Sequence, residues 1–179
     1  KNVDVVSVQR DYIAGEVSRD LTRRMLITEE VKDAHDQGII HFHDTDYFLT
    51  HEHNCGVYNL DDMLQNGTVI SGTMIEKPHS FSTACNIVTQ VIAQIASSSY
   101  GGQTFTLAHL APFVDISRKK FARRLDIQLQ EAGTEIDDAT FNSIVEGQVR
   151  DEVKKGIQTI QYQLITLMTT NGQAPFVSV

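Results

Sequence analysis

Residues 82–99 read STACNIVTQVIAQIASSS, and this stretch decides how the chain folds. Its apolar residues recur at intervals of three and four, a period that places them on one face of an α-helix. The members of that face are Ala84, Ile87, Val88, Val91, Ile92, Ile95 and Ala96. We therefore expect a core helix here, opened by Ser82 and terminated by Gly101 and Gly102.

The carboxyl-terminal half is expected to contain two more helices. The first covers about residues 107–130, with Pro112 as a break or a first-turn residue. A polar connector at 131–138 leads to a long helix over 139–170. Its apolar positions are Phe141, Val145, Val149, Val153, Ile157, Ile160, Leu164 and Met168. Such a helix packs along a neighbour, and the pattern fits equally a helix of this chain or one of a second subunit.

The amino-terminal half is expected to alternate helices with short strands. Residues 11–37 form a helix in two pieces, on which Tyr12, Ile13, Val17, Leu21 and Met25 recur at helical spacing. Thr28 is expected to cap the second piece and Gly38 to end it. Further predicted elements are strands at 39–43, 68–70 and 174–179, and a short helix at 60–65 that Asn59 caps and Asn66-Gly67 stops.

Composition and charge limit the function classes that the chain can serve. Its 179 residues, 41% of them apolar, are enough for one ordinary domain. The net charge of -8 argues against a nucleic-acid-binding surface. No apolar run reaches the roughly 20 residues that a membrane helix needs. Because the chain begins at Lys1 and shows no leader, we expect an internal fragment of a cytoplasmic protein that binds neither nucleic acid nor membrane.

Histidines and acidic residues are dense just before a cysteine. His41, His43, His51, Glu52 and His53 are members of this group, which also contains Asp44, Asp46 and Cys55. Histidines two apart on a strand share a side, so a metal site is one interpretation. Because neither an HExxH helix nor a CxxC pair is present, histidines without a metal are the favoured interpretation. His35 and His109 are expected to have structural roles only.

The two cysteines, Cys55 and Cys85, are expected to be free thiols. In Asn54-Cys55-Gly56, glycine lets a ligand or another backbone approach the thiol closely. From the residues alone, Cys55 is either a reactive thiol or a buried inert one, and reactivity depends on a pKa that a sequence does not reveal. Cys85 lies on the apolar face of the 82–99 helix, and we expect it to be inert.

Two segments are candidate anion sites. Small residues and glycines at 97–102 can expose backbone N–H groups to a phosphate, although neither GxGxxG nor GxxxxGKS is present. Residues 76–80, EKPHS, precede the expected 82–99 helix, where a helix amino terminus favours an anion. The basic run of Arg118 to Lys120, with Arg123 and Arg124, is interpreted first as a solvated helix face.

Several ordered blocks together resemble one enzyme family. They are GIIHFHDTDYF (38–48), NC (54–55), NLDDML (59–64), EKPHSF (76–81), SYGGQT (99–104), LAPF (110–113) and NGQAPF (171–176). This series resembles the catalytic region of anaerobic, class III ribonucleoside-triphosphate reductases over nearly the whole chain. The resemblance implies an α/β fold in which residues 1–179 form one partial catalytic domain, the helix-rich amino-terminal portion of a ten-stranded α/β barrel of the glycyl radical enzyme type.

The resemblance also implies a reaction. In this family a glycyl radical passes to a cysteine in the barrel, and that thiyl removes the 3′ hydrogen of a ribonucleoside triphosphate. Cys55 matches the second cysteine, which helps to expel the 2′-hydroxyl as water. Asn54, His41, His43 and Asp44 are expected to bind or orient the substrate, with no metal among these residues. The reductant is expected to be formate or another small donor.

Regulation and partners are implied by the same resemblance. Deoxynucleoside triphosphate and ATP effectors are expected, with the specificity site at a homodimer interface built from helices at about 82–99, 107–130 and 139–170. The candidate effector-binding residues are Glu76, Lys77, Gln90, Lys119 and Lys120. The radical loop, the thiyl cysteine, a structural zinc site, an ATP-binding regulatory domain and contacts to a radical-SAM activating enzyme are expected outside this chain, so the fragment alone is expected to be inactive.

Two other function classes fit parts of the sequence. A metal-binding module would use His41, His43, His51 and His53. A helical dimerisation segment without chemistry of its own would leave Cys55 unreactive toward thiol reagents in the folded state.

Overall fold

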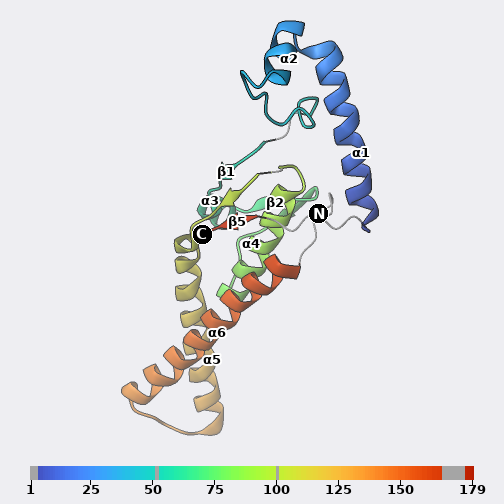
Figure 1. Cartoon of the computed structure of the whole chain (residues 1–179). Helices are drawn as coiled ribbons and strands as arrows, with labels where there is room; N and C mark the ends of the chain where they lie inside the picture. Colours follow the sequence, from blue (N-terminus) through green and yellow to red (C-terminus); the bar gives the residue numbers. More distant parts are fainter. Residues whose placement is uncertain (1–3, 51–52, 100, 167–175) are drawn as a thin grey trace.

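The computed structural model describes residues 4–50, 53–99, 101–166 and 176–179. Figure 1 shows three parts in these residues: a helical amino-terminal unit, a central region with short strands, and a long helical hairpin that extends away from the strands. The fold is α/β and helix-rich, with a small parallel sheet. In the described part of the chain, no helix is long and apolar enough to cross a membrane.

The amino-terminal unit contains α1 (Val6–Leu21), a π-helical turn η1 (Thr22–Leu26) and α2 (Glu29–Asp36). The two predicted pieces and their boundary are confirmed, because the Thr28 hydroxyl accepts the Val31 N–H and Gly38 follows α2 with φ +71°. The first piece begins earlier than expected. Most of its predicted apolar stripe is exposed in the described structure, with Tyr12 at 64% and Met25 at 73% of their full surface, whereas Leu21 is half-buried.

The strand predicted at 39–43 is wrong. The N–H groups of Ile39 and Ile40 both donate to the Ala34 carbonyl, at 2.9 and 3.3 Å, and so complete the end of α2. The N–H of Phe42 donates to His35 Nδ1 at 3.0 Å. Since these backbone donors are used by α2 and its last turn, the segment forms an irregular loop rather than an edge of a sheet.

The parallel sheet lies at the centre of the chain and has the order β1-β4-β5. Its strands are β1 (Gly56–Val57), β4 (Gln103–Thr104) and β5 (Val177–Ser178). In register, Gln103 lies opposite Gly56 on one side and opposite Val177 on the other. The prediction of a strand at 174–179 is confirmed for its described end, whereas residues 174 and 175 lie outside the described residues.

Between β1 and α4 lie a short helix and a hairpin. Helix α3 (Leu60–Gln65) has the predicted bounds, although Asn59 occupies the cap position without a side-chain hydrogen bond. Strand β2 (Thr68–Ile70) is also confirmed, and it pairs antiparallel with β3 (Thr73–Ile75), which the sequence analysis missed.

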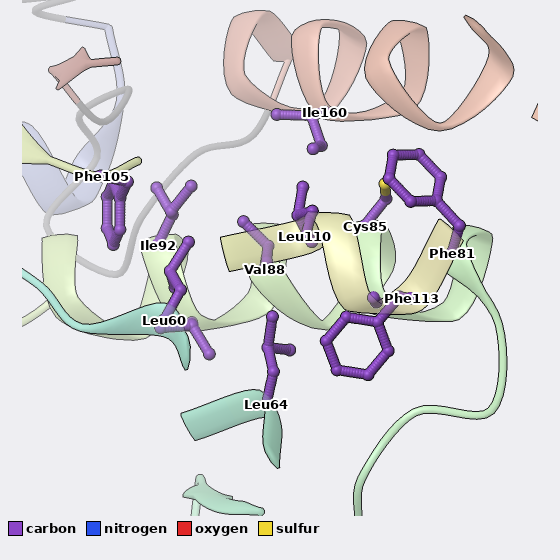
Figure 2. Close-up of a cluster of buried hydrophobic side chains, with 12 residues drawn as sticks. Leu60, Leu64, Phe81, Cys85, Val88, Ile92, Phe105, Leu110, Phe113 and Ile160 are labelled. Carbon is purple, nitrogen blue, oxygen red and sulfur yellow. The ribbon is translucent and has the colours of Figure 1, made fainter. Parts of the chain in front are cut away.

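Helix α4 (Phe81–Ala96) is the centre of the hydrophobic core. Its buried face includes Val88, Val91 and Ile92, as the spacing predicted. Figure 2 shows Leu60 and Leu64 of α3 on one side of α4 and Ile160 of α6 on the other. The cap is Ser80 rather than Ser82, and α4 ends at Ala96, before the glycines that were expected to stop it. Burying each large apolar side chain contributes roughly 1.5–3 kcal/mol.

Two long helices pack against α4. A 3-10 turn η2 (Leu107–Leu110) leads into α5 (Ala111–Ala132), where Pro112 is a first-turn residue as predicted. After the connector, α6 (Asp138–Thr166) contacts both α4 and α5 along its buried residues Val145, Val149, Gly156 and Ile160. The long helix therefore has its neighbours within this chain, and its expected continuation to 170 lies outside the described residues.

Candidate functional site

Cys55 lies at the entry to the parallel sheet, directly before β1. Its side chain is exposed, and its thiol donates to the Asn54 side-chain oxygen at 3.4 Å. Asn54 is exposed as well. The prediction of free cysteines is confirmed for both residues, and the alternative of a buried Cys55 is wrong. The Cys55 thiol is therefore accessible to a ligand that binds beside the start of β1.

The backbone around Cys55 is held by the segment that connects α4 with β4. The Ser99 hydroxyl shares its one proton between the carbonyls of His53 and Asn54, and the Gly101 N–H donates to the Asn54 carbonyl. On the other side of the thiol, the Gly56 N–H donates to the Gly102 carbonyl at 3.0 Å. Residues 97–102 were considered as a phosphate cradle, but the Gly101 N–H in this stretch already donates to the loop that carries Cys55.

Cys85 is in the opposite situation. It is fully buried on α4, beside Phe81 and against α6, as Figure 2 shows. Burial, reinforced by the nearby Glu152 carboxylate, raises the pKa of the Cys85 thiol to about 12. At neutral pH this thiol is protonated and closed to reagents, in agreement with the expectation that it is inert.

The histidine-rich segment forms a compact group next to α2. His41 Nε2 and His43 Nδ1 lie 3.0 Å apart, and His43 Nε2 lies 3.1 Å from Asp44 Oδ1. The His35 ring lies 5.6 Å from that of His41 and accepts the Phe42 N–H, a structural role that matches the expectation for His35. His41 and His43 do face each other, although they lie on a loop rather than on a strand.

The histidine group and Cys55 lie in different parts of the described structure. In Figure 1 the loop after α2 belongs to the amino-terminal unit, whereas β1 lies in the central region. His51 and Glu52 lie outside the described residues. Among the residues that the structure does describe, no group of three or more His, Cys, Asp or Glu side chains is arranged to hold a metal ion.

A basic groove lies along the middle of α5. It has a volume of about 540 Å³ and is lined by His79, Lys119, Lys120, Arg123, Arg124, Ile127 and Gln128. Arg118 belongs to a different environment, because its guanidinium is paired with Asp115 and with Glu146 of α6. Lys119, Lys120, Arg123 and Arg124 are all exposed, which agrees with the interpretation as a solvated helix face, and the groove adds that these cations lie beside His79.

The amino terminus of α4 is not an open anion site. The N–H of Phe81 donates to the Ser117 hydroxyl at 2.8 Å, and the N–H of Ser82 donates to Glu152 Oε1 at 3.3 Å. Ser80 accepts the Thr83 N–H. The expectation of an anion at this helix end is corrected, because side chains already occupy these donors.

The candidate effector residues are only partly brought together. Lys119 and Lys120 line the basic groove with His79, which comes from the EKPHS segment. Glu76 and Lys77 are exposed on that segment, and Gln90 is exposed on α4, but none of the three is among the described residues that line the groove. His79, Arg123 and Arg124 are groove residues that the sequence analysis did not select as effector contacts.

The sequence analysis also missed Ser99 and Gly101 as residues that hold the Cys55 loop. A signal was present, because a run of serines followed by two glycines permits close backbone approach. The partner of that approach lies more than forty residues earlier in the chain, with a separation of 45 between Ser99 and Asn54. Only the folded structure shows that Ser99 and Gly101 lie against the backbone of Asn54.

These features define a class: an α/β chain with an exposed thiol at the start of a parallel strand and a separate basic groove on its helices. The family model described as anaerobic ribonucleoside-triphosphate reductase matches residues 1–179. The chain belongs to that family.

Individual relatives carry the same description. An anaerobic ribonucleoside-triphosphate reductase of Salmonella typhimurium is 37% identical over 99% of this chain and 24% of its own length. The enzyme of Escherichia coli is 36% identical over the same shares. That of Enterobacteria phage T4 is 34% identical over 100% of this chain and 29% of its own length. The chain thus spans about a quarter of the length of these relatives.

Proposed function

We propose that this chain is part of an oxygen-independent reductase that converts ribonucleoside triphosphates to deoxyribonucleoside triphosphates by glycyl and thiyl radical chemistry. The observation that carries the proposal is the exposed Cys55 thiol, which lies directly before a parallel strand on a loop whose backbone is held by a buried hydroxyl, in a member of this family. The radical glycine, the initiating cysteine and the formate or other reductant would be supplied from outside these residues.

Cys55 would work on the face of the ribose that carries the 2′-hydroxyl. A thiol can donate its proton to a leaving hydroxyl, which then departs as water. Exposure of Cys55 supports this role, because the thiol is open to a ligand and already donates to an oxygen acceptor, the Asn54 amide. The Asn54 amide oxygen, which accepts the hydrogen bond of the thiol in this structure, would share this proton with the leaving hydroxyl. Asn54 would also contact the substrate directly.

His41, His43 and Asp44 would orient the substrate rather than bind a metal. Their support is the chain of close contacts from His41 through His43 to the Asp44 carboxylate, which fixes the imidazoles in one arrangement. The loop that carries them is tied to α2 by the bond between Phe42 and His35. Because both ring nitrogens of His43 have partners within the group, His41 Nδ1 is the ring nitrogen that would face a ribose hydroxyl.

The wider architecture would be that of a glycyl radical enzyme. The strands β1, β4 and β5, all parallel, are suitable for the opening strands of a ten-stranded barrel. Residues 1–179 would then form one partial catalytic domain that works in a homodimer, activated by a radical-SAM enzyme and stabilised by zinc bound elsewhere. Deoxynucleoside triphosphate effectors would bind at the basic groove, through Lys119 and Lys120, with Glu76, Lys77 and Gln90 contributing from neighbouring segments.

The role of Cys55 is tested in the full-length enzyme by Cys55→Ser. After activation we expect the glycyl radical signal in electron paramagnetic resonance to be retained, while deoxynucleotide formation is lost, because serine cannot carry out thiol chemistry. The matched control is Cys85→Ala, which removes the other cysteine of this chain from the core and is expected to leave turnover measurable. Turnover by the Cys55→Ser enzyme at the wild-type rate would exclude the proposed role.

A further inference from the structure

We propose that Ser99 and Gly101 are positioning residues for Cys55: the Ser99 hydroxyl and the missing side chain at Gly101 together fix the backbone of residues 53–55. The inference rests on the proposed function of Cys55. In the described structure neither residue forms a hydrogen bond with the thiol, so both would act through the loop that carries it.

The Ser99 hydroxyl binds two successive carbonyls of the cysteine loop. Its oxygen lies 2.7 Å from the His53 carbonyl oxygen and 2.9 Å from that of Asn54. The residue is only 7% exposed, so water does not readily replace these bonds. A parallel bridge between His53 and Ser99 continues the alignment of the two segments ahead of the sheet. One buried hydroxyl therefore fixes the backbone immediately before Cys55.

Gly101 allows the closest approach in this region. Its N–H donates to the Asn54 carbonyl at 3.1 Å, so that carbonyl accepts from both Ser99 and Gly101. A Cβ at position 101 would lie 2.2 Å from Asn54 Oδ1 and 2.3 Å from the Asn54 carbonyl carbon and oxygen. Real Cβ atoms do not come within 3.0 Å of other heavy atoms, so any side chain here would push Asn54 and Cys55 away.

The segment that contains Ser99 and Gly101 is itself bound to the core helix α4. Ser99 follows α4 by only a turn, in which the Ser98 N–H donates to the Ile95 carbonyl. After the glycines, the buried Gln103 side chain donates from Nε2 to the Ile92 carbonyl of α4 at 3.3 Å. Through these links the position of Cys55 is set by the central helix rather than by its own exposed loop.

The experiment compares Ser99→Ala, Ser99→Thr, Gly101→Ala and the control Ser98→Ala in the full-length enzyme. Ser98 is a suitable control because its exposed hydroxyl donates to the Ile95 carbonyl at the end of α4. Turnover is measured with its kcat and KM, and the glycyl radical signal is recorded. The alkylation rate of Cys55 by iodoacetamide is followed on its peptide by mass spectrometry, with the buried Cys85 as the unreactive reference.

We expect kcat to fall by about 10- to 100-fold in Ser99→Ala and Gly101→Ala, because a small misplacement of a reacting group costs about that much. KM and the radical signal should change little, while the alkylation rate of Cys55 shifts several-fold. Ser99→Thr should restore both quantities because it keeps the hydroxyl, and Ser98→Ala should match the wild type.

Two results would overturn the proposal. One is Ser99→Ala and Gly101→Ala enzymes with wild-type kcat and wild-type alkylation of Cys55. The other is a loss of kcat that accompanies a lowered melting temperature with unchanged alkylation of Cys55 and no rescue by threonine, since this describes a purely structural role. If instead Cys55→Ser retained turnover, the proposed function would fail, whereas the alkylation rates would still decide whether Ser99 and Gly101 position the thiol.

Discussion

Two glycines of α6 give opposite expectations when each is replaced by alanine. An added Cβ at Gly156 would lie 2.6 Å from Phe81 Cε1 and 2.8 Å from Cys85 Sγ, where α6 crosses α4. An added Cβ at Gly147 meets nothing within 4 Å. We expect Gly156→Ala to lower the free energy of unfolding by about 1–3 kcal/mol, as overpacking does.

Gly147→Ala should raise the free energy of unfolding by about 0.5–1 kcal/mol, because alanine loses less backbone entropy in a helix. Denaturant titration of the two variants beside the wild type measures both changes, and Gly147→Ala serves as the control for the change in chemistry. Equal effects at the two positions would mean that α6 does not cross α4 at Gly156.

At the scale of single residues, the sequence predicted some environments and missed others. The inert Cys85 followed from its place on an apolar helix face, because helical period alone decides that question. The exposure of Cys55 did not follow, since it depends on which distant backbone meets its loop. The resemblance to a family selected Cys55 as a candidate, but it gave no physical reason for the position of the thiol.

At the scale of elements, the stability of α6 depends on pH through a carboxylate at its start. Asp137 precedes the helix and accepts the Thr140 N–H at 2.9 Å and the Thr140 hydroxyl at 2.7 Å. These bonds stabilise the ionised form and lower the pKa of Asp137 below the ordinary value of 3.8. The stabilisation is fully present above pH 3.8 and is lost as the pH falls through the lower pKa of the folded state.

We expect Asp137→Asn to flatten this part of the pH dependence. The melting temperature of the variant should lie below that of the wild type at neutral pH, and the difference should shrink as the pH drops below 3.8. Asp151→Asn, an exposed change in the middle of α6, controls for the loss of one negative charge. A difference in melting temperature that stayed constant across this range would show that ionisation of Asp137 does not stabilise α6.

Long periodic elements were predictable and short ones were not. The helices α4, α5 and α6 were predicted to within a few residues because each repeats its apolar period over several turns. The strand expected at 39–43 failed because the end of α2 uses its backbone donors. The β2–β3 hairpin was missed because its turn, Ser71-Gly72 with φ of +50° and +79°, uses a serine where asparagine would have been the usual signal.

At the scale of the whole molecule, the net charge is negative but one local cluster of side chains is positive. The chain carries a net charge of -8, yet Lys119, Lys120, Arg123 and Arg124 gather around one groove. Arg118, the neighbour of this cluster, is neutralised by Asp115 and Glu146, which leaves the groove as a separate positive feature. An anionic ligand would be drawn to this place and repelled by much of the remaining surface.

If effectors bind at this groove, removal of its lysines should lower the affinity for deoxynucleoside triphosphates, whereas removal of a lysine elsewhere should not. In the full-length enzyme, Lys119→Gln combined with Lys120→Gln should raise the Kd of a deoxynucleoside triphosphate by about 10-fold or more, because charge-assisted bonds to phosphate are lost. Lys154→Gln is the control, since Lys154 is exposed on α6 and is not among the residues that line the groove. Isothermal titration calorimetry with each of the four deoxynucleoside triphosphates measures these affinities, and sedimentation velocity follows dimer formation alongside. The groove would be excluded as the effector site if the double variant bound these nucleotides as tightly as the wild type. It would also be excluded if the wild-type enzyme bound none of the four and sedimented as a monomer. Neither outcome would affect the proposed role of Cys55.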